Sequence, residues 1–112
     1  MRICVVVRPW TRSYDTTLRT IGGERVTVGV SDLEAPEWRW CTTHDGLAGW
    51  VPEALLDVDV DGLEGVLRED YDAIELTVAE GETVNCERVM AGWGWCVDIA
   101  GNAGWVPLPN LA

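Results

Sequence analysis

Hydrophobic and polar residues alternate over several short stretches of the chain. Residues 24–30 alternate most regularly, and residues 37–42 and 55–60 have the same strand character. Three valines of the first stretch are expected on one face of a strand: Val26, Val28 and Val30. No segment of useful length has the 3.6-residue period of an amphipathic helix, so the pattern predicts an all-β protein of short strands.

Turns and a first strand complete the prediction. Residues 43–46 form a short polar segment in which Gly46 suits a positive φ, and residues 48–51 then read as the returning strand of a hairpin. The apolar run near the start, residues 3–7, is too short for a signal peptide and reads as a first strand.

The sequence contains an internal repeat. Three motifs recur in the same order: Gly23–Val26 as Gly81–Val84, Trp38–Cys41 as Trp93–Cys96, and Ala48–Pro52 as Ala103–Pro107. The first recurs at an offset of 58 and the other two at 55, so the second copy has one loop that is three residues shorter. Such self-similarity predicts two copies of one small structural unit.

Each copy resembles an SH3 domain of the variant found in bacterial proteins. The resemblance rests on the order of Leu, Gly-Glu, an alternating strand, Trp-x-Trp-Cys and Gly-Trp-Val-Pro, and it extends over residues 5–56 and 66–111. It implies two tandem SH3-like small β-barrels, with residues 1–60 in the first domain and residues 61–112 in the second. The second domain then has shorter loops and a truncated last strand.

The resemblance also implies a ligand and a site. SH3 domains bind extended Pro-rich peptides in a shallow aromatic groove, and acidic residues of the first long loop hold a basic residue of the peptide. The matching positions in the first copy are Trp10, Tyr14, Trp38 and Pro52, and those in the second copy are Asp70, Tyr71, Asp72, Trp93 and Pro107. The family's tail tyrosine is replaced by Leu55 and Asn110, and the acidic loop makes the second copy the better candidate for a Pro-rich or basic peptide.

The other tryptophans have competing interpretations. Trp50 and Trp105 precede a valine in the returning strand and are expected in the core or an interface, whereas Trp38 and Trp93 should be partly exposed in the groove. Trp40 and Trp95 share a strand face with Trp38 and Trp93, and they either pack between the copies or line the groove.

Charge limits the classes of partner. The chain has 112 residues, eight arginines and no lysine, and its net charge of −11 argues against binding to nucleic acid or an anionic membrane surface. Most of the negative charge lies in the second half of the chain, since residues 58–112 carry two arginines and eleven acids. No apolar run is long enough for a membrane span, and a cytoplasmic location is expected.

No metal, cofactor or catalytic site is expected. The four cysteines, Cys4, Cys41, Cys86 and Cys96, lack the close spacing of zinc ligands and should be free thiols, with Cys41 and Cys96 in the cores. The only histidine, His44, lies beside Asp45 in a turn without a positioned nucleophile. The chain is therefore predicted to be a binding module and not an enzyme.

Alternatives to peptide binding stay open at this point. The copies could instead form a structural unit that docks on itself or on a partner without using a groove, and a homodimer is compatible with the sequence. Cell-wall binding is a third interpretation, which the lack of an export signal disfavours. Only five residues follow Pro107, which predicts that the second copy has an incompletely paired edge and that residues of the first copy cover it.

Overall fold

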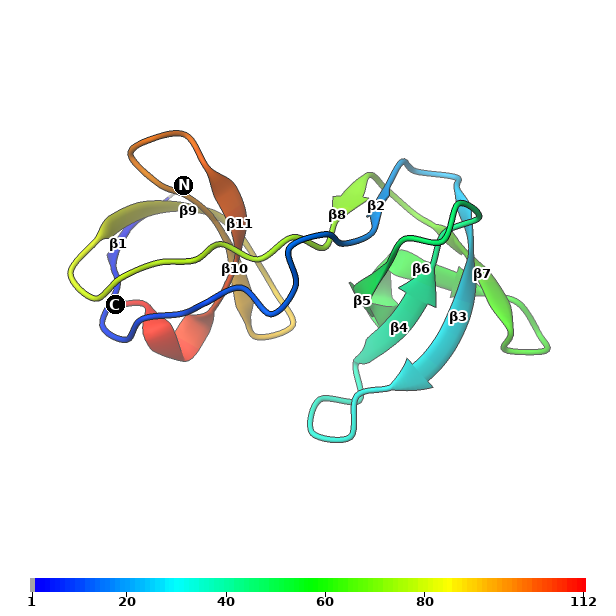
Figure 1. The fold of residues 1–112 in the computed structure, drawn as a ribbon. Coiled ribbons are helices and arrows are strands. Elements are labelled where there is room, and N and C mark those ends of the chain that lie inside the picture. Colours follow the sequence, from blue (N-terminus) through cyan, green and yellow to red (C-terminus); the bar gives the residue numbers. More distant parts are fainter. Residues whose placement is uncertain (1) are drawn as a thin grey trace. The chain divides into compact units, whose positions relative to one another are not determined.

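The computed structural model describes residues 2–112 and is all-β (Figure 1). Apart from two three-residue 3-10 turns, η1 (Glu53–Leu55) and η2 (Leu108–Asn110), the regular elements within this range are strands. The strands are β1 (Arg2–Val5), β2 (Arg19–Thr20), β3 (Arg25–Ser31), β4 (Trp38–Thr42), β5 (Ala48–Pro52), β6 (Leu56–Val58), β7 (Glu64–Leu67), β8 (Tyr71–Asp72), β9 (Thr83–Met90), β10 (Trp93–Val97) and β11 (Ala103–Pro107). No helix in residues 2–112 is long and apolar enough to cross a membrane.

The chain divides into two compact units. Unit 1 consists of residues 1–15 together with residues 74–112, and unit 2 consists of the continuous segment 16–73. Unit 1 contains a four-stranded sheet in the order β1-β9-β10-β11, and unit 2 contains a five-stranded sheet in the order β5-β4-β3-β7-β6 and the short pair β2-β8.

This division differs from the boundary expected near residue 60, because the first strand of each repeat pairs with the body of the other repeat. In unit 1 the Val6 N–H donates to the Glu82 carbonyl (2.8 Å), and in unit 2 the Leu67 N–H donates to the Glu24 carbonyl (3.0 Å). Figure 1 shows the result: blue β1 lies beside yellow β9, and green β7 lies beside blue-cyan β3. Unit 2 is thus inserted, in sequence, into the first long loop of unit 1.

A second set of hydrogen bonds shows that the two exchanged pairings are equivalent. The Gly81 N–H donates to the Val6 carbonyl (2.8 Å), and the Gly23 N–H donates to the Leu67 carbonyl (2.7 Å). Because Gly23 and Gly81 occupy the same position of the repeated Gly-Glu motif, Val6 of unit 1 corresponds to Leu67 of unit 2. Both side chains are 1% exposed, so each is a core residue of its unit.

The core of unit 1 is made by inward-facing residues of its strands and of residues 74–82. Eight buried side chains form the cluster: Cys4, Val6, Leu76, Val78, Val84, Cys86, Cys96 and Val106. Trp10 and Leu111 pack against the cluster. The alternation of these positions along β1 and β9 is the pattern of a sheet with one face in the core.

Two valines do not lie where the alternation predicts. Val26 and Val28 are buried, but Val30 is 71% exposed because the β3-β4 register shifts between Val28 and Ser31. A bulge of this kind turns the following side chain to the other face. Val60 is also fully exposed, because β6 ends at Val58 and a turn follows.

The short tail of the second repeat pairs with only part of the outer edge of the unit 1 sheet. Residues 83–86 of β9 pair with β1, which is sequence from the first repeat, and the tail pairs with the other side of β1. Val5 and Ala112 exchange both backbone hydrogen bonds (2.9 Å each), and Leu111 lies opposite Val6. The outer side of β1 is thus paired by the tail along residues 5–7, and no described strand pairs with it along residues 2–4.

Candidate functional site

The strand exchange regroups the aromatic residues that the sequence nominates. Unit 1 contains Trp10 and Tyr14 from the first repeat together with Trp93 and Pro107 from the second. Unit 2 contains the remaining positions: Trp38, Pro52, Asp70, Tyr71 and Asp72. Each unit thus combines nominated residues from both repeats, whereas the sequence grouped them by repeat.

In unit 1 three of these residues form a continuous partly exposed surface. The rings of Trp10 and Trp93 meet edge to face, with centroids 5.4 Å apart and an interplanar angle of 83°. Pro107 on β11 lies directly opposite Trp93 on β10. Trp10, Trp93 and Pro107 are each half-buried, and Tyr14 of the same unit is 44% exposed. We call Trp10, Trp93 and Pro107 the aromatic surface of unit 1.

The Glu75 carboxylate fixes the orientation of Trp10. Its Oε1 accepts hydrogen bonds from the Trp10 indole Nε1 (2.9 Å) and from the Ser13 N–H and Oγ (3.0 Å each). The Trp10 backbone also exchanges hydrogen bonds with Val78 (3.0 and 2.8 Å). The indole is therefore held in one position before any ligand binds, which lowers the entropy cost of binding.

Asn110 holds the segment that precedes Trp10. Its side-chain Nδ2 donates to the carbonyls of Arg8 (3.2 Å) and Pro9 (3.1 Å), and the residue is 9% exposed. Asn110 thereby positions the backbone next to the aromatic surface.

In unit 2 the corresponding residues are buried. Trp38 is 7% exposed, Tyr71 is 6% exposed and Pro52 is below 2%, and the Tyr71 hydroxyl donates to the Trp50 carbonyl (2.8 Å). The expectation that Trp38 is partly exposed is therefore wrong, while Trp50, expected in the core or an interface, is half-buried. In unit 1 the expectation is correct, since Trp105 is 6% exposed and Trp93 is half-buried.

The acids nominated to hold a basic ligand contact unit 2 itself. Asp70 Oδ1 accepts a hydrogen bond from the Gly22 N–H (2.8 Å), and Asp72 lies 3.9 Å from the Arg19 guanidinium. Neither acid lies in the unit that carries the aromatic surface. A ligand at that surface would be recognised mainly by apolar contacts.

The remaining tryptophans form two matching cross-strand pairs. Trp40 lies opposite Trp50 with ring centroids 5.0 Å apart, and Trp95 lies opposite Trp105 at 5.3 Å. Both pairs are edge to face, an arrangement that stabilises sheets beyond the buried area alone. Their regularity indicates a structural role within each sheet.

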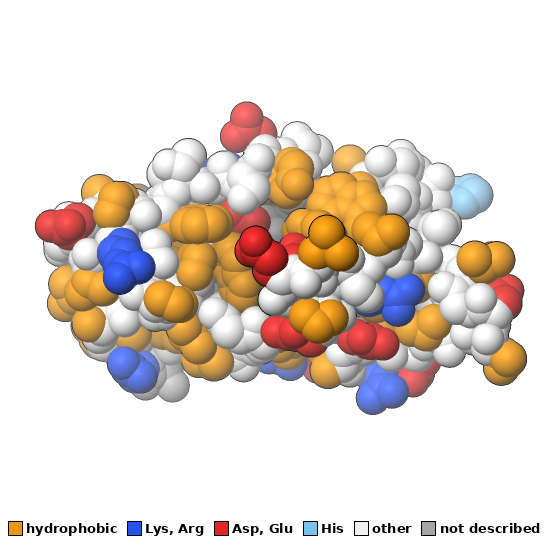
Figure 2. Space-filling view, turned by 90° about the horizontal axis from the view of Figure 1, so that it is seen from below, with side chains coloured by type: hydrophobic (Ala, Val, Ile, Leu, Met, Phe, Trp, Pro, Cys, Tyr) orange, Lys and Arg blue, Asp and Glu red, His pale blue; other side chains and the backbone are white. Residues whose placement is uncertain are grey.

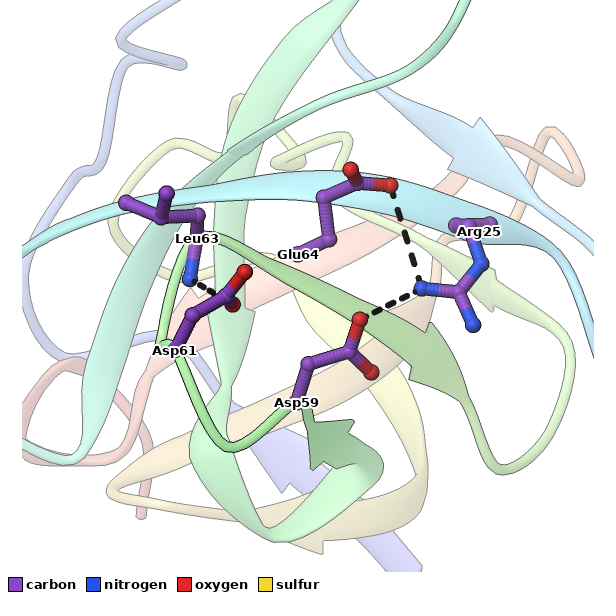
Figure 3. A network of polar contacts seen from close by, with 5 residues as sticks. All are labelled: Arg25, Asp59, Asp61, Leu63 and Glu64. Atoms are coloured by element: carbon purple, nitrogen blue, oxygen red, sulfur yellow. Dashed lines mark hydrogen bonds and ion pairs between the residues drawn. The ribbon is translucent and has the colours of Figure 1, made fainter.

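Three alternating aspartates precede a glycine at the β6-β7 turn, a spacing typical of calcium loops: Asp57, Asp59 and Asp61, followed by Gly62. Two of the three are paired with arginines, since Asp59 lies 2.7 Å from Arg25 and Asp57 lies 2.8 Å from Arg68. Figure 3 shows Arg25 between Asp59 and Glu64, and Asp61 accepting a hydrogen bond from the Leu63 N–H. No group of three or more metal-ligating side chains within residues 2–112 is arranged to hold an ion.

The surroundings of the histidine and the thiols bear on their reactivity. His44 is exposed, and its neighbour Asp45 accepts a 2.6 Å hydrogen bond from the Thr43 hydroxyl, which holds the pKa of Asp45 below its ordinary value. The four thiols are free and buried. Burial raises the pKa of Cys41 to about 11, and burial together with Cys86 and Cys4 raises the pKa of Cys96 to about 12. At neutral pH these two thiols stay protonated and are poor nucleophiles.

Sequence reasoning missed the roles of Glu75 and Asn110. Glu75 reads as one acid among several in a loop, and Asn110 reads only as the replacement of a tyrosine. Their hydrogen-bond partners lie 62 to 65 and 101 to 102 positions away, so no local signal could reveal them.

Comparison of the chain with models of protein families, with characterised proteins and with solved structures found no significant match.

Proposed function

We propose that the chain is a non-catalytic binding module built from two SH3-like barrels, and that unit 1 binds extended, Pro-rich peptide segments of a partner protein. The observation that carries the proposal is the partly exposed Trp10–Trp93 pair beside Pro107. Flat, rigid rings of this kind suit proline side chains, which lose little entropy on docking. The sequence resemblance supports the same fold and ligand class.

The proposal places the main site in unit 1. The corresponding tryptophan, tyrosine and proline of unit 2 are less than 9% exposed and present little apolar area to a ligand. Unit 2 carries four arginines and thirteen acids, a net charge of −9, whereas unit 1 carries four arginines and six acids, a net of −2. Unit 2 would therefore attract a basic partner electrostatically without supplying the aromatic contact. Four buried free thiols suit a reducing compartment, so the proposed setting is the cytoplasm.

The test is a titration of the full chain with Pro-rich peptides in the polyproline II conformation, followed by isothermal calorimetry. Trp93→Ala should weaken binding at least about tenfold, which corresponds to about 1.4 kcal/mol. Trp50→Ala is the matched control, because Trp50 is also half-buried but lies in unit 2. Equal losses in the two variants, or binding that ignores Trp93→Ala, would contradict the proposal.

A structural or assembly role is the second candidate, and one observation favours it. Three apolar side chains at alternate positions of the first segment point to solvent: Ile3 (66% exposed), Val5 (46%) and Val7 (43%). Exposed hydrophobic side chains are visible as orange groups in Figure 2. A row of β-branched residues on a sheet face is typical of an interface. If this role holds, Val5→Thr together with Val7→Thr should abolish self-association in analytical ultracentrifugation and leave peptide binding unchanged.

A further inference from the structure

Unit 1 has a hollow of about 370 Å³ between the start of β1 and the second half of β9. Cys4 and Cys86, which are 3% and 7% exposed, form its floor, and Leu108 and Leu111 line its side. Arg2 and Arg88 lie at the rim with Glu87, so the rim is more basic than the rest of this acidic chain. The hollow is separate from the aromatic surface, because none of its lining residues belongs to that surface.

The hollow adjoins an open edge of β1. β1 is the outer strand of its sheet, and its partner on the other side extends only along residues 5–7, through the contacts of Ala112, Leu111 and Asn110. In an antiparallel strand, alternate residues direct their N–H and C=O groups to the same edge. Since Val5 and Val7 bond to this edge, the backbone groups of Ile3 point to it as well, and no described strand lies opposite them.

Unit 2 shows what occupies the corresponding position. There β6 continues along β7 with Leu56 opposite Leu67, Asp57 opposite Val66 and Val58 opposite Gly65. Leu67 corresponds to Val6, so Gly65 corresponds to Cys4. Val58 is half-buried, and its Cα would lie 3.4 Å from a Cβ on Gly65. A residue placed opposite Cys4 in unit 1 would likewise direct its side chain inward, into the hollow.

We propose that unit 1 has a second peptide site, in which an extended segment of a partner protein adds an antiparallel strand along residues 2–4. The segment places a branched apolar side chain opposite Cys4, over the floor of the hollow. Its next residue exchanges backbone hydrogen bonds with Ile3. The residue after that carries a carboxylate, which meets Arg2 and Arg88 at the rim. Strand addition of this kind gains affinity from the main chain and specificity from the pocket.

This site goes beyond the function proposed for the aromatic surface and does not depend on it. The aromatic surface would select prolines, which cannot donate in a strand ladder. The β1 edge would instead select a β-branched residue followed two positions later by an acid. The two sites therefore accept different peptides.

The test uses the full chain, labelled with ¹⁵N, and the peptide acetyl-Gly-Val-Thr-Asp-Gly-amide as the probe. Amide resonances of Ile3, Cys4, Cys86 and Val89 should shift on titration, and Val→Gly in the peptide should weaken binding about tenfold. Ile3→Pro should weaken binding at least tenfold, because it removes the edge N–H while the N–H groups that face β9 remain. Ile3→Val keeps the donor and should bind within twofold of the unchanged chain.

A tethered probe decides the outcome if the free peptide binds too weakly to saturate. Val-Thr-Asp appended after Ala112 should slow hydrogen exchange of the Ile3 amide at least tenfold, and Gly-Thr-Gly appended at the same place should not. Unchanged exchange with the first extension would overturn the proposal. Free-peptide shifts centred on Trp10 and Trp93 would overturn it as well, because they would assign the peptide to the aromatic surface.

Discussion

Trp38 and Trp93 occupy matching positions of the two repeats but have different surroundings. Trp38 is 7% exposed in unit 2, whereas Trp93 is half-buried in unit 1 and contacts Trp10. Different segments complete the two units: the long first loop in unit 1 carries Trp10, whose ring meets Trp93, and the one in unit 2 carries Tyr71. Matching motifs therefore have different neighbours that are remote in sequence.

Substitution of these two tryptophans should separate their roles. Trp38→Ala removes a buried ring and should lower the free energy of unfolding by about 3–5 kcal/mol. Trp93→Ala removes a partly exposed ring, so it should cost less, on the order of 2 kcal/mol. Urea unfolding followed by far-UV circular dichroism measures both. If Trp93→Ala lowered the free energy of unfolding more than Trp38→Ala, Trp93 and not Trp38 would be the more buried ring, which would contradict the structure.

The buried thiols predict a decline of stability at alkaline pH. Burial raises the pKa of Cys41 to about 11 and that of Cys96 to about 12, while unfolded thiols titrate near 8.5. The folded chain thus holds protons that the unfolded chain loses, so the contribution is complete below about pH 8.5 and is lost as the pH rises toward 11–12.

Unfolding midpoints in urea should therefore fall between pH 8 and pH 11. Cys96→Ala should flatten this dependence, because it removes the thiol with the higher pKa. If the urea midpoint fell equally steeply with pH in Cys96→Ala and in the unchanged chain, the raised pKa of Cys96 would not be the cause of the decline.

At the scale of elements, alternation and turn residues locate much of the structure. The hairpin of β4 and β5 follows from its two Trp-containing strands and the turn at Gly46, whose φ of +89° is the positive value expected there. The bulge that exposes Val30 has no sequence signal, because its cause is the register with β4 and the 2.8 and 3.0 Å hydrogen bonds from the Arg39 guanidinium to the Gly29 carbonyl.

A close backbone approach in unit 1 gives an element-scale prediction. A Cβ on Gly104 of β11 would lie 2.6 Å from the backbone C of Glu75 and the backbone N of Leu76. Gly104→Ala should therefore push the 74–76 segment away from β11 and cost about 1–3 kcal/mol, the range of overpacking. Ala103→Ser, at the neighbouring half-buried position, is the control and should unfold near the unchanged chain. Wild-type thermal stability for Gly104→Ala would be inconsistent with the parallel contact of Glu75 and Trp105.

At the scale of the whole molecule, the sequence predicts two units but not which first strand belongs to which. Both repeats carry an apolar strand ahead of the long loop, and both present the same Gly-Glu partner positions, so local pattern fits either pairing. When β7 pairs with the first repeat, β6 and β7 form a tight hairpin whose turn is closed by the Gly62-to-Asp59 hydrogen bond (2.9 Å). A short loop of this kind costs less conformational entropy to close than a long one. Tertiary contacts therefore decide which first strand joins which unit, and they also decide which residues make up the candidate site.

The continuity of unit 2 predicts that it folds without the rest of the chain. Residues 16–73 contain every strand of their five-stranded sheet and of the β2-β8 pair. A fragment of these residues should give a dispersed amide spectrum as a monomer. The fragment 1–60 lacks β7 and β8 and should be less stable. A folded 1–60 fragment beside an unfolded 16–73 fragment would favour the unexchanged arrangement.

Cross-strand nuclear Overhauser effects in the full chain test the exchange most directly. The amide proton of Val6 should show contacts to Gly81 and Glu82, and that of Leu67 should show contacts to Gly23 and Glu24, as the hydrogen bonds require. The unexchanged arrangement would instead join Val6 to Glu24 and Leu67 to Glu82. Observation of the first set supports the interleaved units and the aromatic surface built on them, and observation of the second set contradicts both.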